Sequence, residues 1–223
     1  MSCSCCGGNA CDSFFGEKMA RRELRAYLGR GLRGDARVLA DWALARAPGA
    51  ARVLEVGGGV GAIQAELVRA GAAEGTVVEV VPAWESYARQ LAEQTGISER
   101  TSFVLADLAE QPEAVAPADV VALRRVVCCS PYGPRLLGVA AGLTRRLLVA
   151  SYPRRTRLVR AGIRAQNALF ALLRREFRVY LHDPAALTAA AEDAGLQRVQ
   201  THRSFLWESA LFERRMGQVV EAT

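Results

Sequence analysis

The sequence predicts an α/β fold with a doubly wound, mostly parallel sheet, closed by a C-terminal antiparallel strand pair and preceded by an N-terminal helical cap. Three observations carry this prediction. Short apolar runs alternate with helical segments from residue 52 onward, as in parallel sheets. The last two apolar runs are separated by a short turn only, which favours an antiparallel pair. Residues 16–46 show the helical spacing of apolar side chains.

The composition is that of a globular protein. The chain has 223 residues, of which 51% are hydrophobic and 23% charged, and this balance excludes disorder over the whole length. A net charge of +6 permits an anionic partner without requiring one. No apolar stretch reaches the roughly 18 residues of a membrane-spanning helix. The N-terminal segment also lacks the apolar centre of a secretory signal, so we expect a cytoplasmic protein.

The chain is expected to have four segments. They are a cysteine-rich tail at residues 1–13, the helical cap at 14–47, the main domain at 48–215 and a C-terminal tail at 216–223. Within the cap, Gly29, Gly31 and Gly34 divide the helical pattern into two helices, because glycine disfavours a helix interior.

The main domain is expected to begin with five strands and three helices. The strands are predicted at residues 52–56, 76–81, 102–105, 119–123 and 147–151, and the helices at 63–69, 84–94 and 135–143. An arginine-rich helix follows at 157–175. The next helix, 183–195, has Asp183 as its N-cap and Pro184 at its first position. Two last strands, at residues 198–202 and 206–212, complete the sheet.

The clearest local signal is the segment Val53-Leu54-Glu55-Val56-Gly57-Gly58-Gly59-Val60-Gly61. A buried strand leads here into a turn with four glycines in five positions, and then into a helix. Glycine lets the backbone turn tightly and approach a ligand, because no Cβ is in the way. The turn stands at the carboxyl end of the first strand, where open α/β sheets bind ligands.

Three acidic residues accompany the glycine turn. Glu55 precedes it, Glu79 lies near the end of the second strand, and Asp107 follows the third. The turn alone also fits a loose dinucleotide-binding pattern, G-x-G-x-x-A. Together with the three acids, however, it resembles the Rossmann-like class I S-adenosylmethionine (SAM)-dependent methyltransferases. The resemblance covers about residues 50–213, including the C-terminal antiparallel pair.

The resemblance implies an enzyme that transfers a methyl group in line from SAM to a small-molecule acceptor. The cofactor-binding residues expected from it are Glu55, Gly57, Gly59, Gly61, Glu79, Val80, Asp107, Leu108 and Arg125. The three glycines would line the amino-acid part of the cofactor. Glu79 would bind both ribose hydroxyls, and Asp107 with Leu108 would hold the adenine. Nearby acids also favour a cationic sulfonium.

Three segments resemble a narrower subgroup of small bacterial methyltransferases. They are residues 11–32 (CDSFFGEKMARRELRAYLGRGL), 125–131 (RVVCCSP) and 151–153 (SYP). This subgroup is similar to magnesium-protoporphyrin O-methyltransferases. Those enzymes carry a histidine and a tyrosine before the proline that follows strand four, where this chain has Cys129 and Ser130. The departure argues against a tetrapyrrole carboxyl group as the acceptor.

Three side chains are candidates for catalysis. Cys129 lies just past the fourth strand, where this family faces the transferring methyl group, and a thiolate there could act as a nucleophile or bind a soft substrate. Its neighbour Cys128 is expected to be a small buried hydrophobe. His182 is a candidate general base or orienting group, and Tyr27 of the cap is a candidate for the substrate pocket. For each of the three, the alternative is a structural role.

Four cysteines near the N-terminus, namely Cys3, Cys5, Cys6 and Cys11, have the spacing C-x-C-C-x4-C. Thiolates this close could bind a metal such as zinc or an iron–sulfur cluster. The paired C-x-x-C knuckles of common zinc sites are missing, however. The alternative is a tail with oxidisable thiols.

The arginine-rich helix is the main sequence signal for a binding partner. The amphipathic helix 157–175 could lie on an anionic membrane or cover a hydrophobic acidic substrate, or it could pack one face on the sheet and solvate the other. A nucleic-acid partner is not expected, because no appended RNA-binding module is found. RNA methylation, a non-catalytic SAM- or metal-binding protein and an NAD-dependent oxidoreductase are the alternative functions. The methyl acceptor and the oligomeric state are not encoded in any pattern found.

Overall fold

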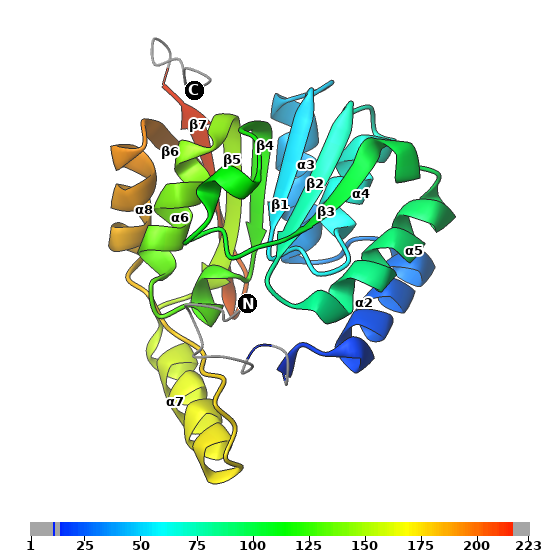
Figure 1. Ribbon diagram of the computed structural model, residues 1–223. Coiled ribbons are helices and arrows are strands. Elements are labelled where there is room, and N and C mark those ends of the chain that lie inside the picture. Colours follow the sequence, from blue (N-terminus) through cyan, green and yellow to red (C-terminus); the bar gives the residue numbers. More distant parts are fainter. Residues whose placement is uncertain (1–10, 12–13, 216–223) are drawn as a thin grey trace.

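The computed structural model describes residue 11 and residues 14–215. Seven strands form its central sheet in the order β3-β2-β1-β4-β5-β7-β6 (Figure 1). Strands β1 to β5 pair in parallel, whereas β7 runs antiparallel to both β5 and β6. The predicted fold class, a mostly parallel sheet with a C-terminal antiparallel pair, is therefore confirmed.

The elements follow the predicted order. The strands are β1 (Arg52–Val56), β2 (Glu74–Glu79), β3 (Thr101–Leu105), β4 (Ala118–Arg124), β5 (Thr144–Pro153), β6 (Leu196–Arg203) and β7 (Trp207–Arg214). The helices are α2 (Glu17–Arg30), α3 (Asp35–Arg46), α4 (Ala62–Arg69), α5 (Glu85–Thr95), α6 (Gly133–Gly142), α7 (Arg157–Leu172) and α8 (Pro184–Asp193). Strand β5 extends beyond its predicted ends, because it pairs with β4 on one side and β7 on the other.

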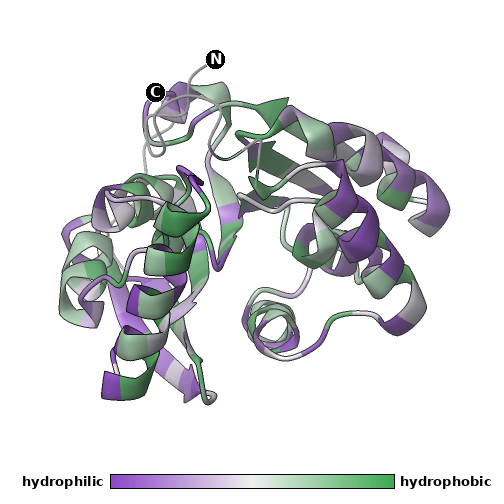
Figure 2. Cartoon of the chain, turned by 90° about the horizontal axis from the view of Figure 1, so that it is seen from below, coloured by the Kyte–Doolittle hydropathy of each residue, from purple (hydrophilic) through white to green (hydrophobic). Residues whose placement is uncertain are grey.

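Alternate residues of the central strands face opposite layers. In β4, Val120 and Ala122 belong to one core, and Val121 and Leu123 belong to the other. Helices α3, α4 and α5 cover the first core, and α6 and α8 cover the second. A sheet covered on both faces buries most positions of the central strands β1, β4 and β5, which explains their continuous apolar runs in the sequence. Figure 2 shows these hydrophobic strands enclosed between the helices.

The cap consists of α2 and α3. Gly31 and Gly34, which separate the two helices, have positive φ angles of 63° and 57°, a conformation that favours glycine. Gly29 lies within α2 instead and does not interrupt it. Helix α3 packs on α4, β5 and β7, and α2 packs on α5, so both helices are held against the main body of the molecule.

Helix α7 ends at Leu172, earlier than its pattern predicts. Arg174 has a φ of 53°, and the backbone N–H of Arg175 donates to the carbonyl of Phe170 at 2.8 Å. This bond closes the helix in the way that usually requires glycine at the left-handed position. Because arginine occupies that position, the sequence contains no stop signal, and the predicted end at residue 175 is wrong.

The antiparallel pair offers a matched test of burial. Phe212 is fully buried in β7, whereas Phe205 stands exposed in the turn before it. Phe212→Ala should lower the free energy of unfolding by about 3–5 kcal/mol, because it removes a buried phenyl group. Phe205→Ala should change it by less than about 0.5 kcal/mol. Urea denaturation measures both values, and equal effects would contradict the position of β7 inside the sheet.

Candidate active site

A cavity of about 340 Å³ opens at the carboxyl ends of the parallel strands. The turns after β1, β2, β3 and β4 all contribute to its wall, because the carboxyl ends of parallel strands share one edge of the sheet. Glu23 and Ala36 of the cap complete it. Of the residues singled out from the sequence, the wall contains Cys11, Glu55, Gly57, Gly59, Glu79, Val80, Asp107, Leu108, Arg125 and Cys129.

The glycine turn brings bare backbone to the cavity. Gly57 and Gly59 have φ angles of 57° and 58°, in the left-handed region. A Cβ on Gly59 would lie 2.8 Å from Cζ3 of Trp84, and one on Gly57 would lie 2.5 Å from Cγ2 of Val126. Any side chain at either position would therefore displace the wall. Gly61 is not among the described wall residues and instead caps α4.

Glu79 ends β2 with a buried carboxylate. Its Oε1 accepts hydrogen bonds from the N–H groups of Val80 (2.9 Å) and Val81 (3.3 Å), and its Oε2 accepts one from Gly59 (3.1 Å). Burial raises the pKa of Glu79, and these three donors oppose the rise. A carboxylate has about four acceptor sites. The group is therefore clamped to the glycine turn and retains capacity for a ligand hydroxyl.

Glu55 supports the glycine turn from within. Its Oε2 accepts a hydrogen bond of 2.8 Å from the N–H of Gln64. A Cβ on Gly58 would approach Cγ of Glu55 to 2.7 Å, so the two are packed closely. Burial raises the pKa of Glu55 to about 8, although the donor from Gln64 acts in the opposite direction. The carboxyl group is therefore mostly protonated at neutral pH and adds little negative charge to the cavity.

Asp107 and Leu108 follow β3 at the same edge of the sheet. Oδ1 of Asp107 accepts a hydrogen bond of 3.1 Å from the N–H of Ala109, which closes a short turn. Leu108, Val80 and Leu136 add apolar surface to the wall. An apolar slot beside a carboxylate suits a flat ring that carries a hydrogen-bond donor.

An ion pair between the buried Asp35 and the partly exposed Arg125 ties the end of β4 to the cap. Arg125 donates from Nε and Nη2 to the carboxylate of Asp35, at 2.9 and 2.6 Å, and Ser151 Oγ donates to the same group at 2.9 Å. The guanidinium also lies 4.2 Å from the ring centroid of Trp207. Burial acts to raise the pKa of Asp35, but Arg125, Arg124 and Ser151 together hold it below its usual value. The carboxylate is therefore ionised.

Arg124 and Glu23 face the cavity with unused hydrogen-bonding capacity. Nη1 of Arg124 is 3.7 Å from Oε1 of Glu23, and its Nε is 3.6 Å from Oδ2 of Asp35, both longer than a hydrogen bond. This buried Nε has no hydrogen-bond partner among the described residues. Burial raises the pKa of Glu23, and Arg124 and Arg125 oppose the rise. The pair can therefore bind a polar group of a ligand.

Of the three catalytic candidates, only Cys129 lines the cavity. Its Sγ lies 3.5 Å from the carbonyl oxygen of Arg125, and Sγ of Cys128 lies 3.3 Å from the same oxygen. A hydrogen bond with Cys129 lowers the pKa of the Cys128 thiol, against the effect of burial. The two neighbouring thiols thus form a polar unit beside the cavity.

Tyr27 and His182 lie elsewhere. The hydroxyl of Tyr27 donates to Oε2 of Glu66 at 2.9 Å, and burial raises the pKa of Tyr27 to about 12. Nε2 of His182 is 2.9 Å from the carbonyl oxygens of both Val127 and Ser130. Because both oxygens can only accept a hydrogen bond, Nε2 carries the proton. His182 thereby stabilises the turn after β4. The structure brings neither side chain to the cavity, and their predicted catalytic roles have no geometric support.

The predicted metal site lies mostly outside the described residues. Cys3, Cys5 and Cys6 belong to the part of the chain that the structure does not describe, and Cys11 is buried in the cavity wall. Within residue 11 and residues 14–215, no three His, Cys, Asp or Glu side chains gather as possible ligands of a metal ion. A metal or iron–sulfur cluster at the four cysteines therefore stays a prediction.

Sequence reasoning missed the network that joins the cap to β4. Glu23, Asp35 and Arg124 pair with residues far away along the chain, so no local spacing connects them. One signal was available. Two consecutive arginines end a buried strand, and charged groups in such a place require partners.

The comparison with protein families decides the class of the domain. Residues 54–146 match the family model described as a methyltransferase domain. Over this stretch the chain is similar to methyltransferase domains. The resemblance indicated by the glycine turn and the three acids is confirmed, and no curated protein matches the sequence.

Solved structures share the fold of the methyltransferase domain. A magnesium protoporphyrin IX methyltransferase from Synechocystis PCC 6803 with bound S-adenosylhomocysteine (SAH) is 22% identical, over 91% of this chain and 97% of that one, with a TM-score of 0.68. An O-methyltransferase family protein from Burkholderia thailandensis is 21% identical, over 91% of this chain and 60% of that one, with a TM-score of 0.69. At these identities the likeness concerns the fold.

The buried carboxyl group of Glu55 predicts that the free energy of unfolding depends on pH. The unfolded Glu55 carboxyl ionises near 4.5 and the folded one at about 8, so between these values the folded state binds more protons and loses stability as the pH rises. Glu55→Gln mimics the protonated form and should remove this contribution. Relative to the variant, the wild type should lose up to about 1.4 kcal/mol of unfolding free energy per pH unit.

Urea denaturation between about pH 5 and pH 8 measures this difference. Glu99→Gln, at an exposed position, is the control and should leave the pH slope of the wild type unchanged. An equal slope in Glu55→Gln and the wild type would contradict the assigned burial of the carboxyl group.

Proposed function

We propose that the protein is a SAM-dependent methyltransferase that acts on a small-molecule acceptor. One observation carries the proposal. The carboxylate of Glu79 is buried at the end of β2, is hydrogen-bonded to the glycine turn, and lines a cavity within a methyltransferase domain. The acceptor capacity that Glu79 retains suits a hydroxyl of a ribose, and such a charged hydrogen bond contributes about 1.5–3 kcal/mol.

The cavity residues fit the methyl donor. The backbone at Gly57 and Gly59 can be approached closely, because any Cβ there would clash with the wall. Asp107 with Leu108 offers a carboxylate and an apolar surface for the adenine. The Synechocystis relative is described with bound SAH and with bound SAM, and this supports the same ligand here. We assign these contacts to the donor.

The charges of the cavity also suit a cation. SAM, when bound, supplies a methyl group activated on a positively charged sulfur. The charge of Arg125 is taken up by Asp35, whereas Glu23, Glu79 and Asp107 remain in the wall. Arg125 therefore positions the turn after β4 rather than contacting the donor through its guanidinium. Arg124, whose guanidinium is only loosely paired with Glu23 and Asp35, is the side chain that we assign to a carboxylate group of a ligand.

The acceptor is assigned to the remaining part of the cavity. A volume of about 340 Å³ is that of a small-molecule site. Cys129 and Ser130 after β4 and Met19 of the cap line it. An acceptor that carries a proton must lose it during the transfer, and Glu23, whose pKa burial raises, is the wall carboxylate that we assign as proton acceptor. Cys129 stays a candidate for contact with the acceptor.

The proposal is tested by calorimetric titration of the purified protein with SAM and SAH. The two ends of β2 supply a matched pair of variants, because Glu74 is exposed and Glu79 is buried at the cavity. Glu79→Ala should weaken binding at least about tenfold, since it removes the acceptor of the ribose hydroxyls. Glu74→Ala should bind like the wild type.

NADH is the control ligand in the same titration. Binding of NADH in place of SAM, or equal binding of SAM by both variants, would contradict the proposed function. If SAM binds but no SAH forms with any of a panel of small-molecule acceptors, the chain binds the donor without catalysis, and the enzymatic part of the proposal is wrong.

A further inference from the structure

Helix α7 projects from the body of the molecule (Figure 1). Together with its flanking residues it forms a segment that we call the basic arm, residues 154–178. One stripe of α7, with Val159 and Phe170, is buried against the molecule. The other two stripes are exposed, and they differ in character. The exposed surface of the arm is therefore amphipathic by itself, with an apolar stripe beside a basic one, and the buried stripe is a third face.

The first exposed stripe is apolar. Leu158, Leu169 and Leu172 recur at helical spacing, and their exposed fractions are 62%, 52% and 79%. One exposed leucine would be ordinary, but several on one face of a helix form an apolar patch. Such a patch on a protein surface normally marks a contact site. Leu173 continues the stripe at the end of the helix.

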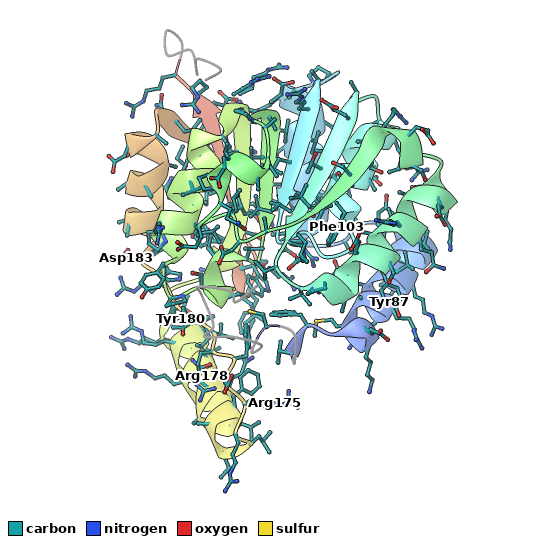
Figure 3. All side chains as sticks on the ribbon, viewed as in Figure 1. Tyr87, Phe103, Arg175, Arg178, Tyr180 and Asp183 are labelled. Atoms are coloured by element: carbon teal, nitrogen blue, oxygen red, sulfur yellow. The ribbon has the colours of Figure 1, made fainter. Side chains whose placement is uncertain are left out.

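The second exposed stripe is basic. The arm carries the eight arginines Arg154, Arg155, Arg157, Arg160, Arg164, Arg174, Arg175 and Arg178, and the single acid Glu176. Its net charge of +7 exceeds the +6 of the whole chain, so the remaining residues are close to neutral. Within the described residues, the only salt bridge of the arm joins Arg155 to Asp183. Figure 3 shows Arg175 and Arg178 beside the end of α7, and Asp183 at its base.

A second apolar feature adjoins the arm. The turn between β6 and β7 exposes Phe205 (71%) and Leu206. This turn is joined to the arm by hydrogen bonds of 2.9 Å from Arg154 to the carbonyl oxygens of Ser204 and Leu206. Two elements far apart in the sequence thus present exposed apolar side chains and arginines at one place.

We propose that the basic arm and the turn at residues 204–206 bind the surface of a bilayer rich in anionic lipids. An interfacial helix has this composition: apolar side chains enter the boundary of the acyl chains, and arginines beside them contact the phosphate groups. Each arginine near an anionic surface adds about a fivefold gain in affinity. The structure describes no helix of the length and hydropathy needed to cross a bilayer, so the contact is peripheral.

The same surface adjoins the cavity. The arm begins directly after β5, at the edge of the sheet where the cavity opens. Phe14 stacks on Phe177 with ring centroids 4.4 Å apart, and Phe15, which lines the cavity, contacts Phe177 at 5.1 Å. An arm bound to a bilayer would therefore place the cavity next to it. This inference does not depend on the proposed methyl donor.

Two other occupants of this surface are less well matched. A second copy of the chain would bring two segments of high positive charge together, which is unfavourable. A nucleic acid would engage the arginines but would leave the exposed leucines and Phe205 in water. Only an anionic bilayer matches both stripes at once.

The test is co-sedimentation of the full chain with vesicles. Vesicles of phosphatidylcholine alone are compared with vesicles that also contain phosphatidylglycerol. The wild type should sediment with the anionic vesicles only, and high salt should release it. The triple variant Arg157→Gln, Arg160→Gln, Arg164→Gln should lose about a hundredfold in affinity. The apolar variant Leu169→Ser, Leu172→Ser should also lose binding.

The matched control removes three arginines from the opposite edge of the sheet. Arg52, Arg100 and Arg146 lie at or near the starts of β1, β3 and β5, and their replacement by Gln lowers the net charge equally. This control should bind as the wild type does. Equal loss in both triple variants, absence of wild-type binding to anionic vesicles, or a dimer that the arm variants dissociate in sedimentation velocity would each overturn the proposal.

Discussion

The site depends on the ion pair between the buried carboxylate of Asp35 and the guanidinium of Arg125. Asp35 begins α3 of the cap, Arg125 follows β4, and Ser151 of β5 donates to the same carboxylate. One side chain therefore joins the cap to two strands of the sheet. Loss of Arg125 would leave the buried carboxylate of Asp35 with only Ser151 and the more distant Arg124 as partners, which is destabilising. Since α2 and α3 are consecutive, the pair also places Glu23 of α2 over the cavity.

This pairing determines how charge is distributed around the cavity. Arg125 is neutralised by Asp35, and Glu55 is held mostly protonated by burial. The charged groups left to interact with a ligand are Glu79 and Asp107 after β2 and β3, Arg124 at the end of β4, and Glu23 of the cap. At the glycine turn the cavity offers carboxylate acceptors for hydroxyls. Beside the cap it offers both a cation, Arg124, and an acid, Glu23. The proposed donor, with its ribose and sulfonium groups, and a polar acceptor would find complementary partners there.

Parallel topology brings the cavity and the basic arm to one edge. The parallel strands all end at this edge, so the turns after β1 to β4 build the cavity and the segment after β5 becomes the arm. The aromatic contacts of Phe14 and Phe15 with Phe177 connect the two. A surface suited to anionic lipid and a cavity suited to a small molecule thus share a side of the molecule because of the winding of the sheet.

Local patterns in the sequence determined the α/β fold, the glycine turn and the acids at the strand ends, because these depend on periodicity and on the backbone freedom of single residues. The stop of α7 at Leu172 escaped prediction, since Arg174 takes a conformation that glycine would have signalled. Only the tertiary structure decided which side chains meet. It placed Cys129 at the cavity and His182 behind the turn after β4, and it paired Asp35 with Arg125. The reason is physical: such contacts join residues that are distant along the chain, and no local spacing records them.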